Sequence, residues 1–246
     1  QEAALAGSGV PLKFHRRLKR AFWHEDAVGS APAILIGNEF LDTFAVQQFV
    51  FANGKWRPRM VGVDGEGRLQ FFTDAEGDYQ LKPVPAALEP KEADVCEVAV
   101  DLSVFASVYF GGLAEARPFA ALFFDYGHEE TSFGDTLQAV EDHKAVSPLL
   151  APGETDLTAQ VDFQQFANAC RAAESAALEV DGPISQAEFL GGLGIIERAS
   201  RLMSANPGKA GEIEMGVARL MAPQGMGTRF KAIGVRSNGL PVLPGF

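Results

Sequence analysis

The clearest feature of the hydrophobic pattern is a set of three short apolar runs with segments of helical period between them. The runs lie at 33–36, 119–124 and 230–235. Short uninterrupted apolar runs are typical of strands that are buried on both faces, as in parallel sheets covered by helices. Helical patterns fill much of the remaining chain, at 102–116, 163–174, 186–193, 197–204 and 210–221. The pattern therefore predicts an α/β fold with a largely parallel sheet.

A group of three strand-like segments interrupts this alternation of apolar runs and helical segments. Residues 46–51, 57–63 and 68–73 have the composition of strands, and Asn53-Gly54 between the first two is a strong signal for a tight hairpin. We expect an antiparallel meander and a helix inserted at 46–117, with 1–45 and 118–246 building the α/β domain. Residues 128–162 are polar and rich in turn signals, which predicts a long functional loop.

Two smaller expectations concern the second half of the chain. Met215 and Met221 are expected to fill the core beneath a helix, because methionine adapts well to irregular gaps. The tail that follows Val235 is expected to be mobile, as chain ends commonly are.

Polar residues follow the first apolar run directly. Asn38, Glu39 and Asp42 come after Gly37, and ligands of open α/β sheets bind beyond the carboxyl ends of the strands. If the chain turns helically here, Glu39 and Asp42 stand at positions i and i+3 and face one another. Alternatively, Asn38 or Asp42 only caps the following helix. The second run ends in the same way at Asp125-Tyr126, so neighbouring strands would border one pocket.

Composition limits the classes of partner. The formal net charge is −11, with 32 acidic and 21 basic residues. This balance disfavours nucleic acid and anionic membranes, which need clustered positive charge, and permits a basic substrate. The two cysteines and four histidines show no metal-ligand spacing, so neither a metal site nor a disulfide is predicted. No apolar run reaches the roughly 18 residues of a membrane span.

Several ordered motifs resemble one family. Residues 38–49 resemble the Asn-Glu-Phe-Phe-Asp-Ala-Leu-Pro-Val segment of the MidA family of S-adenosylmethionine (SAM)-dependent methyltransferases. The resemblance continues over most of the chain, at Trp23-His24-Glu25, Asp125-Tyr126-Gly127-His128, 133–139, 156–163 and 230–235. It implies a class I SAM-methyltransferase (Rossmann-like) sheet, in which the strands lie in the order 3-2-1-4-5-7-6.

The resemblance also implies a function. The family includes a mitochondrial complex I assembly factor that dimethylates an arginine of a complex I subunit, so the implied activity is N-methylation of a protein arginine with SAM as cofactor. Carboxylates can hold a guanidinium in a planar fork and take up its proton. The candidate catalytic residues are Glu39, Asp42 and Asn38. The candidate cofactor-binding residues are Trp23, His24, Glu25, Asn38, Asp125 and Tyr126. The 46–117 insertion would cap the substrate side.

Some expected family features are absent. The glycine-rich loop after the family's first strand and the acidic residue after its second have no counterpart here. Residues 19–23 would be strand three and 33–37 strand four, so the two strands that belong between them are missing. Ala45 and Gln160 also replace residues common in the family. We therefore expect a sheet that is incomplete in its N-terminal half and a chain that is the C-terminal part of a longer polypeptide.

Other functions stay open at this point. One is a non-catalytic assembly factor whose meander and loops bind a protein client, and another is a truncated, inactive fragment. The expected location is the cytoplasm for a bacterial protein and the mitochondrial matrix for a eukaryotic one. A homodimer is also left open.

Overall fold

The computed structural model describes residues 31–74, 88–141, 144–173 and 178–246. The expected strand at 19–23 and the candidate cofactor residues Trp23, His24 and Glu25 lie outside these ranges.

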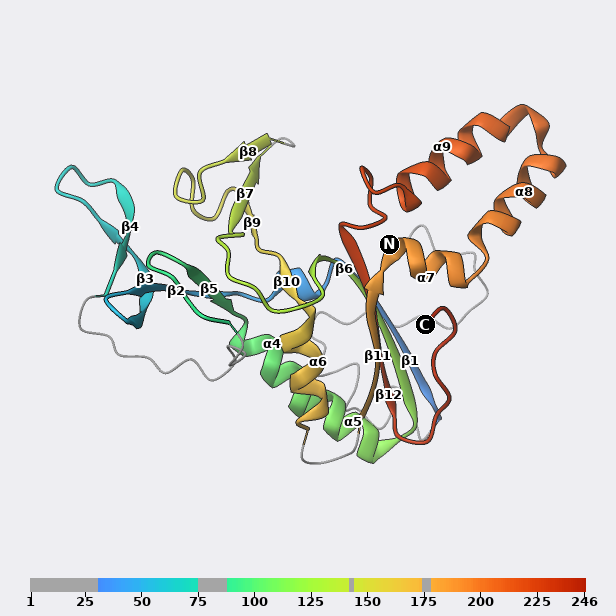
Figure 1. Ribbon diagram of the computed structural model, residues 1–246, viewed down its shortest axis with the longest axis horizontal. Coiled ribbons are helices and arrows are strands. Elements are labelled where there is room, and N and C mark those ends of the chain that lie inside the picture. Colours follow the sequence, from blue (N-terminus) through green and yellow to red (C-terminus); the bar gives the residue numbers. More distant parts are fainter. Residues whose placement is uncertain (1–30, 75–87, 142–143, 174–177) are drawn as a thin grey trace.

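A mixed sheet forms the centre of the molecule (Figure 1). Its main strands lie side by side in the order β1 (Ala33–Asn38), β6 (Phe119–His128), β12 (Phe230–Ser237) and β11 (Leu178–Ser185). β1 and β6 are parallel, and β12 is antiparallel to both of its neighbours, β6 and β11. This arrangement matches strands four, five, seven and six of the implied class I order. The predicted α/β class is confirmed, but the described sheet is mixed rather than largely parallel, because β12 runs antiparallel to both of its neighbours.

One face of the sheet packs against a layer of helices. Phe119, Ala121 and Phe123 of β6 are buried there, because alternate residues of a strand point to the same face. They contact a continuous helical segment and one further helix: α4 (Val100–Val104), the π-helical η2 (Phe105–Phe110), α5 (Gly111–Ala116) and α6 (Phe163–Arg171). The ring centroids of Phe110 and Phe119 are 5.5 Å apart. Burial of each of these phenylalanine side chains stabilises the fold by about 1.5–3 kcal/mol. The helix at 100–116 therefore belongs to the main core.

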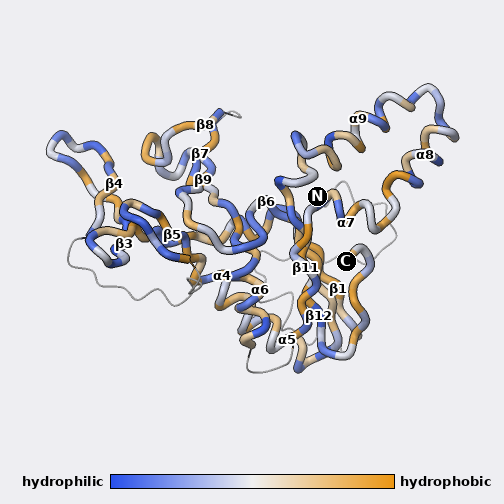
Figure 2. The backbone as a smooth tube through the Cα atoms, in the orientation of Figure 1, coloured by the Kyte–Doolittle hydropathy of each residue, from blue (hydrophilic) through white to orange (hydrophobic). Residues whose placement is uncertain are grey.

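The opposite face is covered only in part. α7 (Gln186–Gly192) places Phe189 against Phe124 of β6, with 5.1 Å between the ring centroids, and Phe246 packs on Phe189. Toward β1 this cover ends, and Ile34 and Ile36 are 81% and 73% exposed. Figure 2 shows hydrophobic residues along the strands of this sheet. Within the described residues, β1 pairs with β6 alone.

The C-terminal tail is fixed, and the expectation of a mobile tail is wrong. The backbone N–H of Leu243 donates to the Asp181 carboxylate over 3.0 Å. That carboxylate also accepts two hydrogen bonds from the buried guanidinium of Arg236, at 2.9 and 3.1 Å. A buried ion pair on β11 and β12 therefore anchors the tail.

A second, antiparallel sheet extends from the main one. Its order is β4 (Leu69–Thr73), β3 (Lys55–Val63), β2 (Gln47–Ala52) and β5 (Val95–Val98). The hairpin at Asn53-Gly54 is confirmed, with Ala52 opposite Lys55. The fourth strand, β5, was not expected. It places Cys96 beside Phe49 in a small separate core.

The expectation of a single long loop at 128–162 is wrong. The segment contains a small sheet of β8 (Lys144–Val146), β7 (Gln138–Glu141) and β9 (Asp156–Thr158), and then β10 (Val161–Asp162), which pairs with β6. Asp162 ends this segment by capping α6, and its Oδ1 accepts the Gln165 N–H at 2.8 Å.

Two helices project from the sheet as an arm (Figure 1). α8 (Ile195–Ala205) and α9 (Ala210–Met221) are joined by the 3-10 turn η3 (Pro207–Lys209). Met215 on α9 is 70% exposed, so its expected place in the core is wrong. In the described part of the chain, no helix combines the length and apolar character needed to cross a membrane.

Removal of the anchoring carboxylate tests the tail. The Asp181→Ala variant leaves the Arg236 guanidinium buried without its main partner, which we expect to cost about 3–5 kcal/mol. Glu179→Ala is the control, because Glu179 lies 3.8 Å from Arg236 and is 48% exposed. Its loss should cost less than about 1 kcal/mol. Urea unfolding monitored by circular dichroism measures both; equal losses would contradict the anchoring role.

Candidate functional site

The candidate site is a short loop at the carboxyl ends of β1 and β6. Gly37 and Asn38 are the last two residues of β1. A Cβ atom at position 37 would lie only 2.6 Å from the Phe123 ring. Glu39 follows with φ +48° and donates its N–H to the Phe124 carbonyl over 2.9 Å. A left-handed backbone is uncommon for a residue other than glycine, and such strain is concentrated at functional sites. Asn38 and Glu39 are both exposed.

The side chain of Asp125 holds this loop in place through hydrogen bonds to its backbone. Its side chain is fully buried, and its Oδ2 accepts the N–H groups of Leu41 and Asp42 at 2.8 and 3.1 Å. Its Oδ1 accepts the N–H of Tyr126 at 3.0 Å. These bonds hold the 3-10 turn η1 (Leu41–Thr43) against the end of β6. The structure thus gives Asp125 a positioning role, and its contact with a cofactor stays a prediction.

Asp42 is oriented by two hydroxyl groups from distant segments. Its Oδ2 accepts hydrogen bonds from the Tyr126 hydroxyl and from Thr158 Oγ1, the latter at 3.3 Å. Its Oδ1 is buried and has no hydrogen-bond partner in the described part of the chain. The helical turn begins at Leu41, so Glu39 lies outside it and the expected i, i+3 pair with Asp42 does not form as a helical pair. Sequence reasoning did not single out Thr158 as a site residue.

Burial changes the proton affinity of two groups here. Burial, with the nearby charge of Asp42, raises the pKa of Asp125 to about 7, although backbone N–H groups partly oppose the change. Burial and the hydrogen bond to Asp42 also raise the pKa of Tyr126. The phenol therefore stays protonated and acts as the donor to Asp42.

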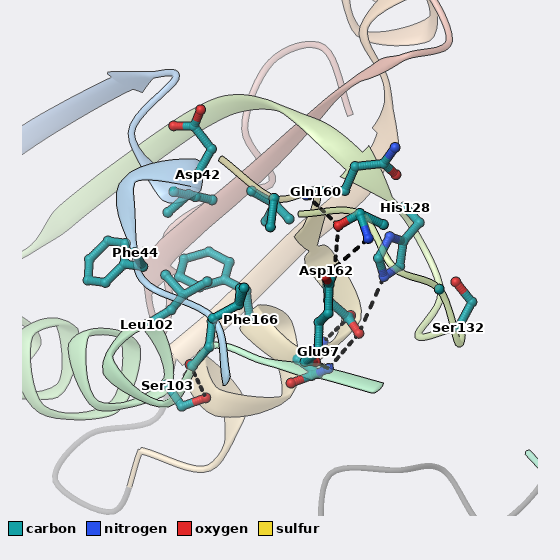
Figure 3. Close-up of a pocket in the computed structure, with 18 of the residues that line it drawn as sticks. Asp42, Phe44, Glu97, Leu102, Ser103, His128, Ser132, Gln160, Asp162 and Phe166 are labelled. Carbon is teal, nitrogen blue, oxygen red and sulfur yellow. Dashed lines mark hydrogen bonds and ion pairs between the residues drawn. The ribbon is translucent and has the colours of Figure 1, made fainter. Parts of the chain in front are cut away.

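A cavity of about 120 Å³ lies beside this loop (Figure 3). Its walls come from η1, β5, α4, α6 and the chain around β10. The view shows Phe44, Leu102 and Phe166 grouped together, with His128, Ser132 and Asp162 across from them. The lining residues include Leu41, Asp42, Phe44, Glu97, Leu102, Ser103, His128, Ser132, Gln160, Asp162, Gln165 and Phe166.

The polar groups of this cavity are organised by hydrogen bonds. His128 Nε2 lies 3.5 Å from Asp162 Oδ2. Burial alone would raise the pKa of Asp162, but the nearby His128 side chain and a hydrogen bond from the Gln165 N–H outweigh it and lower that pKa. Glu97 accepts bonds from Gln48 Nε2 at 2.7 Å and the Thr136 N–H at 3.1 Å. No group of three or more His, Cys, Asp or Glu side chains suited to a metal ion occurs among the described residues.

The strand order and the polar loop at the carboxyl ends of β1 and β6 define a domain of the Rossmann-like methyltransferase class. The chain belongs to the family described as "putative S-adenosyl-L-methionine-dependent methyltransferase", whose sequence model matches residues 1–184. The resemblance found in the motifs is confirmed.

Individual relatives carry more specific names. The chain is 32% identical over 228 residues to the human mitochondrial protein arginine methyltransferase NDUFAF7, and 31% identical over 232 residues to the rat protein of the same name. These alignments cover 91% of this chain and 48% of each relative. The chain thus spans about half the length of the curated relatives it matches.

A solved structure supports the same fold. A Burkholderia thailandensis protein, crystallised with S-adenosyl-homocysteine, superposes with a TM-score of 0.70 at 25% identity. The match covers 87% of this chain and 55% of the other.

The Asp125→Asn variant tests the buried carboxyl. The native pKa of about 7 lies above the ordinary value of 3.8, so the folded state holds this proton more tightly than the unfolded state. The contribution of Asp125 to stability is therefore complete below about pH 4 and is lost as the pH rises through about 7. Relative to Asp125→Asn, the wild type should lose stability across that window and then stay level. Urea unfolding at several pH values measures this; parallel curves would contradict the raised pKa.

Proposed function

We propose that this chain supplies the acceptor-side half of a SAM-dependent methyltransferase that N-methylates arginine in a protein. The observation that carries the proposal is the strained loop at the end of β1, where Glu39 is exposed and Asp42 is held by two hydroxyl groups. Family membership supports the cofactor, and the names of the human and rat relatives support arginine as the acceptor.

The proposed cofactor would lie beside β1 rather than in the cavity. A cofactor of this size needs a pocket of roughly 300–1,000 Å³, which the cavity of about 120 Å³ does not offer. Asn38 and Glu39 are exposed at the end of β1 and fit a ligand placed there. The exposed Ile34 and Ile36, together with the edge of β1 that has no partner among the described residues, fit a sheet that continues past β1.

The chain's own groups suit the acceptor side of this reaction. When bound, SAM supplies an electrophilic methyl group, and the acceptor nitrogen must lose a proton as it gains the methyl. A guanidinium is a poor nucleophile because it stays protonated at neutral pH. We assign Glu39 to hold the guanidinium and take up that proton, and Asp42 to accept a second N–H. Asn38 would hold the cofactor's amino-acid end or the substrate.

The cellular setting is also a proposal. The human and rat relatives are named as mitochondrial proteins, which supports the mitochondrial matrix for a eukaryotic source. The cytoplasm remains the prediction for a bacterial source, and the homodimer remains a prediction as well. A protein bearing the target arginine is the proposed partner.

The Glu39→Gln variant tests the catalytic assignment. The assay protein is a chimera in which the part of the human relative that this chain does not match precedes Gln1. We expect Glu39→Gln to reduce methyl transfer to an arginine peptide about 100-fold or more, since general-base catalysis contributes about 10²–10⁴. Binding of S-adenosyl-homocysteine, measured by isothermal titration, should not change.

Glu66→Gln is the matched control, because Glu66 is an exposed acid in the turn between β3 and β4, far from the loop in the chain. Full methyl transfer by Glu39→Gln would remove Glu39 from the mechanism. A chimera that binds S-adenosyl-homocysteine, retains a protein client and transfers no methyl group would favour the assembly-factor function. Isothermal titration of the chain alone, with its intact mass, shows whether these residues form any cofactor site by themselves.

A further inference from the structure

A groove opens in the second sheet where β2 and β3 separate. The two strands pair from Phe49 opposite Pro58 to Ala52 opposite Lys55. β3 then continues to Val63 with β4 as its single strand partner in the described chain, and Figure 1 shows the β3–β4 hairpin projecting from the rest of this sheet. A cavity of about 410 Å³ lies in the gap. This volume falls within the roughly 300–1,000 Å³ of ligand pockets.

We propose that this groove binds an extended segment of a partner protein, which adds to the open edge of β3 as a further strand. The segment is apolar at alternate positions and carries acidic groups. Addition of a strand to a sheet edge is a recurring mode of peptide recognition, in which main-chain hydrogen bonds give affinity and side-chain pockets give specificity. The inference concerns a docking surface and does not rest on methyl transfer.

The backbone groups of β3 face the groove at alternate residues. The Asp74 N–H donates to the Pro58 carbonyl at 3.0 Å, so the backbone of Pro58 faces β4. In an antiparallel ladder this direction alternates along the strand. The backbone groups of Arg59, Val61 and Val63 therefore face the other side, where no strand of the described chain pairs with them. An extended segment laid along this side can exchange hydrogen bonds with all three residues.

The side chains along this edge are apolar and exposed on both faces of the sheet. Met60 is 46% exposed on one face, and Val61 and Val63 are 51% and 65% exposed on the other. Phe71 and Leu137 extend the apolar lining of the groove. A strand presents its side chains alternately to the two faces. A segment with apolar residues at alternate positions would therefore cover one of these exposed faces and keep its other side chains polar.

One end of the groove is held by side-chain contacts. Gln48 is buried, accepts a hydrogen bond from Arg59 at 3.2 Å and donates one to Asp135 at 2.8 Å. Arg59 also forms an ion pair with Asp135 at 2.6 Å, and its guanidinium lies 4.0 Å from the centroid of the Phe71 ring. These contacts join β2, β3 and the chain before β7. A groove that is formed in advance loses less conformational entropy when a ligand binds.

The distribution of charge favours an acidic segment. Residues 46–73, which build the β2–β4 meander, contain four Lys or Arg and two Asp or Glu, so their net charge is +2. The whole chain carries −11, which leaves −13 on the other residues. Complementary potentials steer binding partners and exclude those of like charge. An acidic segment is therefore directed to the meander rather than to the remainder of the chain.

Fluorescence anisotropy with a labelled peptide tests the docking mode. The probe is the fluorescein-labelled peptide Asp-Glu-Val-Thr-Val-Thr-Val-Thr, titrated with the full chain. Two further forms are N-methylated on the three valines or on the three threonines. An added strand uses the N–H groups of one set only, so one form should bind about tenfold or more weakly and the other within about threefold of the probe. Equal loss by both forms, or loss by neither, would overturn strand addition.

A charge-reversed peptide tests the chemistry of the partner. In this peptide Lys-Lys replaces Asp-Glu, and the rest is unchanged. We expect it to bind about tenfold or more weakly than the probe at low salt, with a difference that shrinks as salt screens the charges. Equal binding at low salt would overturn the acidic partner.

A matched pair of variants locates the binding. Val61 lines the groove, whereas Leu69 of β4 is exposed on the same face and is not among the described residues that line it. Val61→Glu should weaken probe binding about tenfold or more, because a carboxylate in the groove repels the acidic segment. Leu69→Glu should leave binding unchanged, and thermal unfolding checks that both variants fold. Unchanged binding by folded Val61→Glu, or no binding by the folded wild type, would overturn the site.

Sedimentation velocity identifies a competing occupant. A chain that binds no probe and forms a dimer that Val61→Glu abolishes would assign the groove to a second copy and overturn the peptide site. The Glu39→Gln variant should bind the probe as the wild type does. Loss of methyl transfer or of S-adenosyl-homocysteine binding therefore leaves this docking surface in place, and loss of probe binding leaves the proposed function in place.

Discussion

The hydrogen bonds from the backbone of Leu41 and Asp42 to the Asp125 carboxylate are the interaction on which the candidate site depends. Leu41 and Asp42 lie 84 and 83 residues from Asp125 in the sequence. The bonds fix the turn after β1 on the end of β6. Because the neighbouring Tyr126 binds the Asp42 side chain, two consecutive residues of β6 hold the backbone and the carboxylate of one loop residue. The position of Asp42 is therefore set by the pairing of two strands.

Much of the fold could be predicted from local pattern, because each confirmed element depends on its own residues. The apolar runs of β1, β6 and β12 and the Asn53-Gly54 turn are of this kind. The structure adds β5 and the small β7–β9 sheet, whose strands are short and of mixed composition. β5 forms by pairing with the distant β2, and β9 pairs back onto the local β7–β8 hairpin. For Met215 the local element is predicted correctly and its place in the fold is not. Its helix was predicted, but no local pattern indicates that α9 extends away from the core.

The site shows the same division between local and distant information. Asn38, Glu39 and Asp42 could be found from their place after a buried strand. The left-handed backbone at Glu39 could not, because a glutamate gives no local signal for a positive φ. Thr158 lies 116 residues from Asp42 in sequence, so nothing near either residue indicates their contact. The cavity likewise needs segments from both sheets, which only the folded chain brings together.

The side of β1 that no described residue covers has a consequence for how the molecule behaves in solution. A strand edge with free backbone groups is a template for another strand, and natural proteins protect such edges with charge, proline or a covering segment. On β1 the outward side chains are Ile34 and Ile36, which provide an apolar contact instead of a charge barrier. Unless another segment covers it, this edge favours concentration-dependent self-association, so the same surface that suits sheet extension also creates a risk of aggregation.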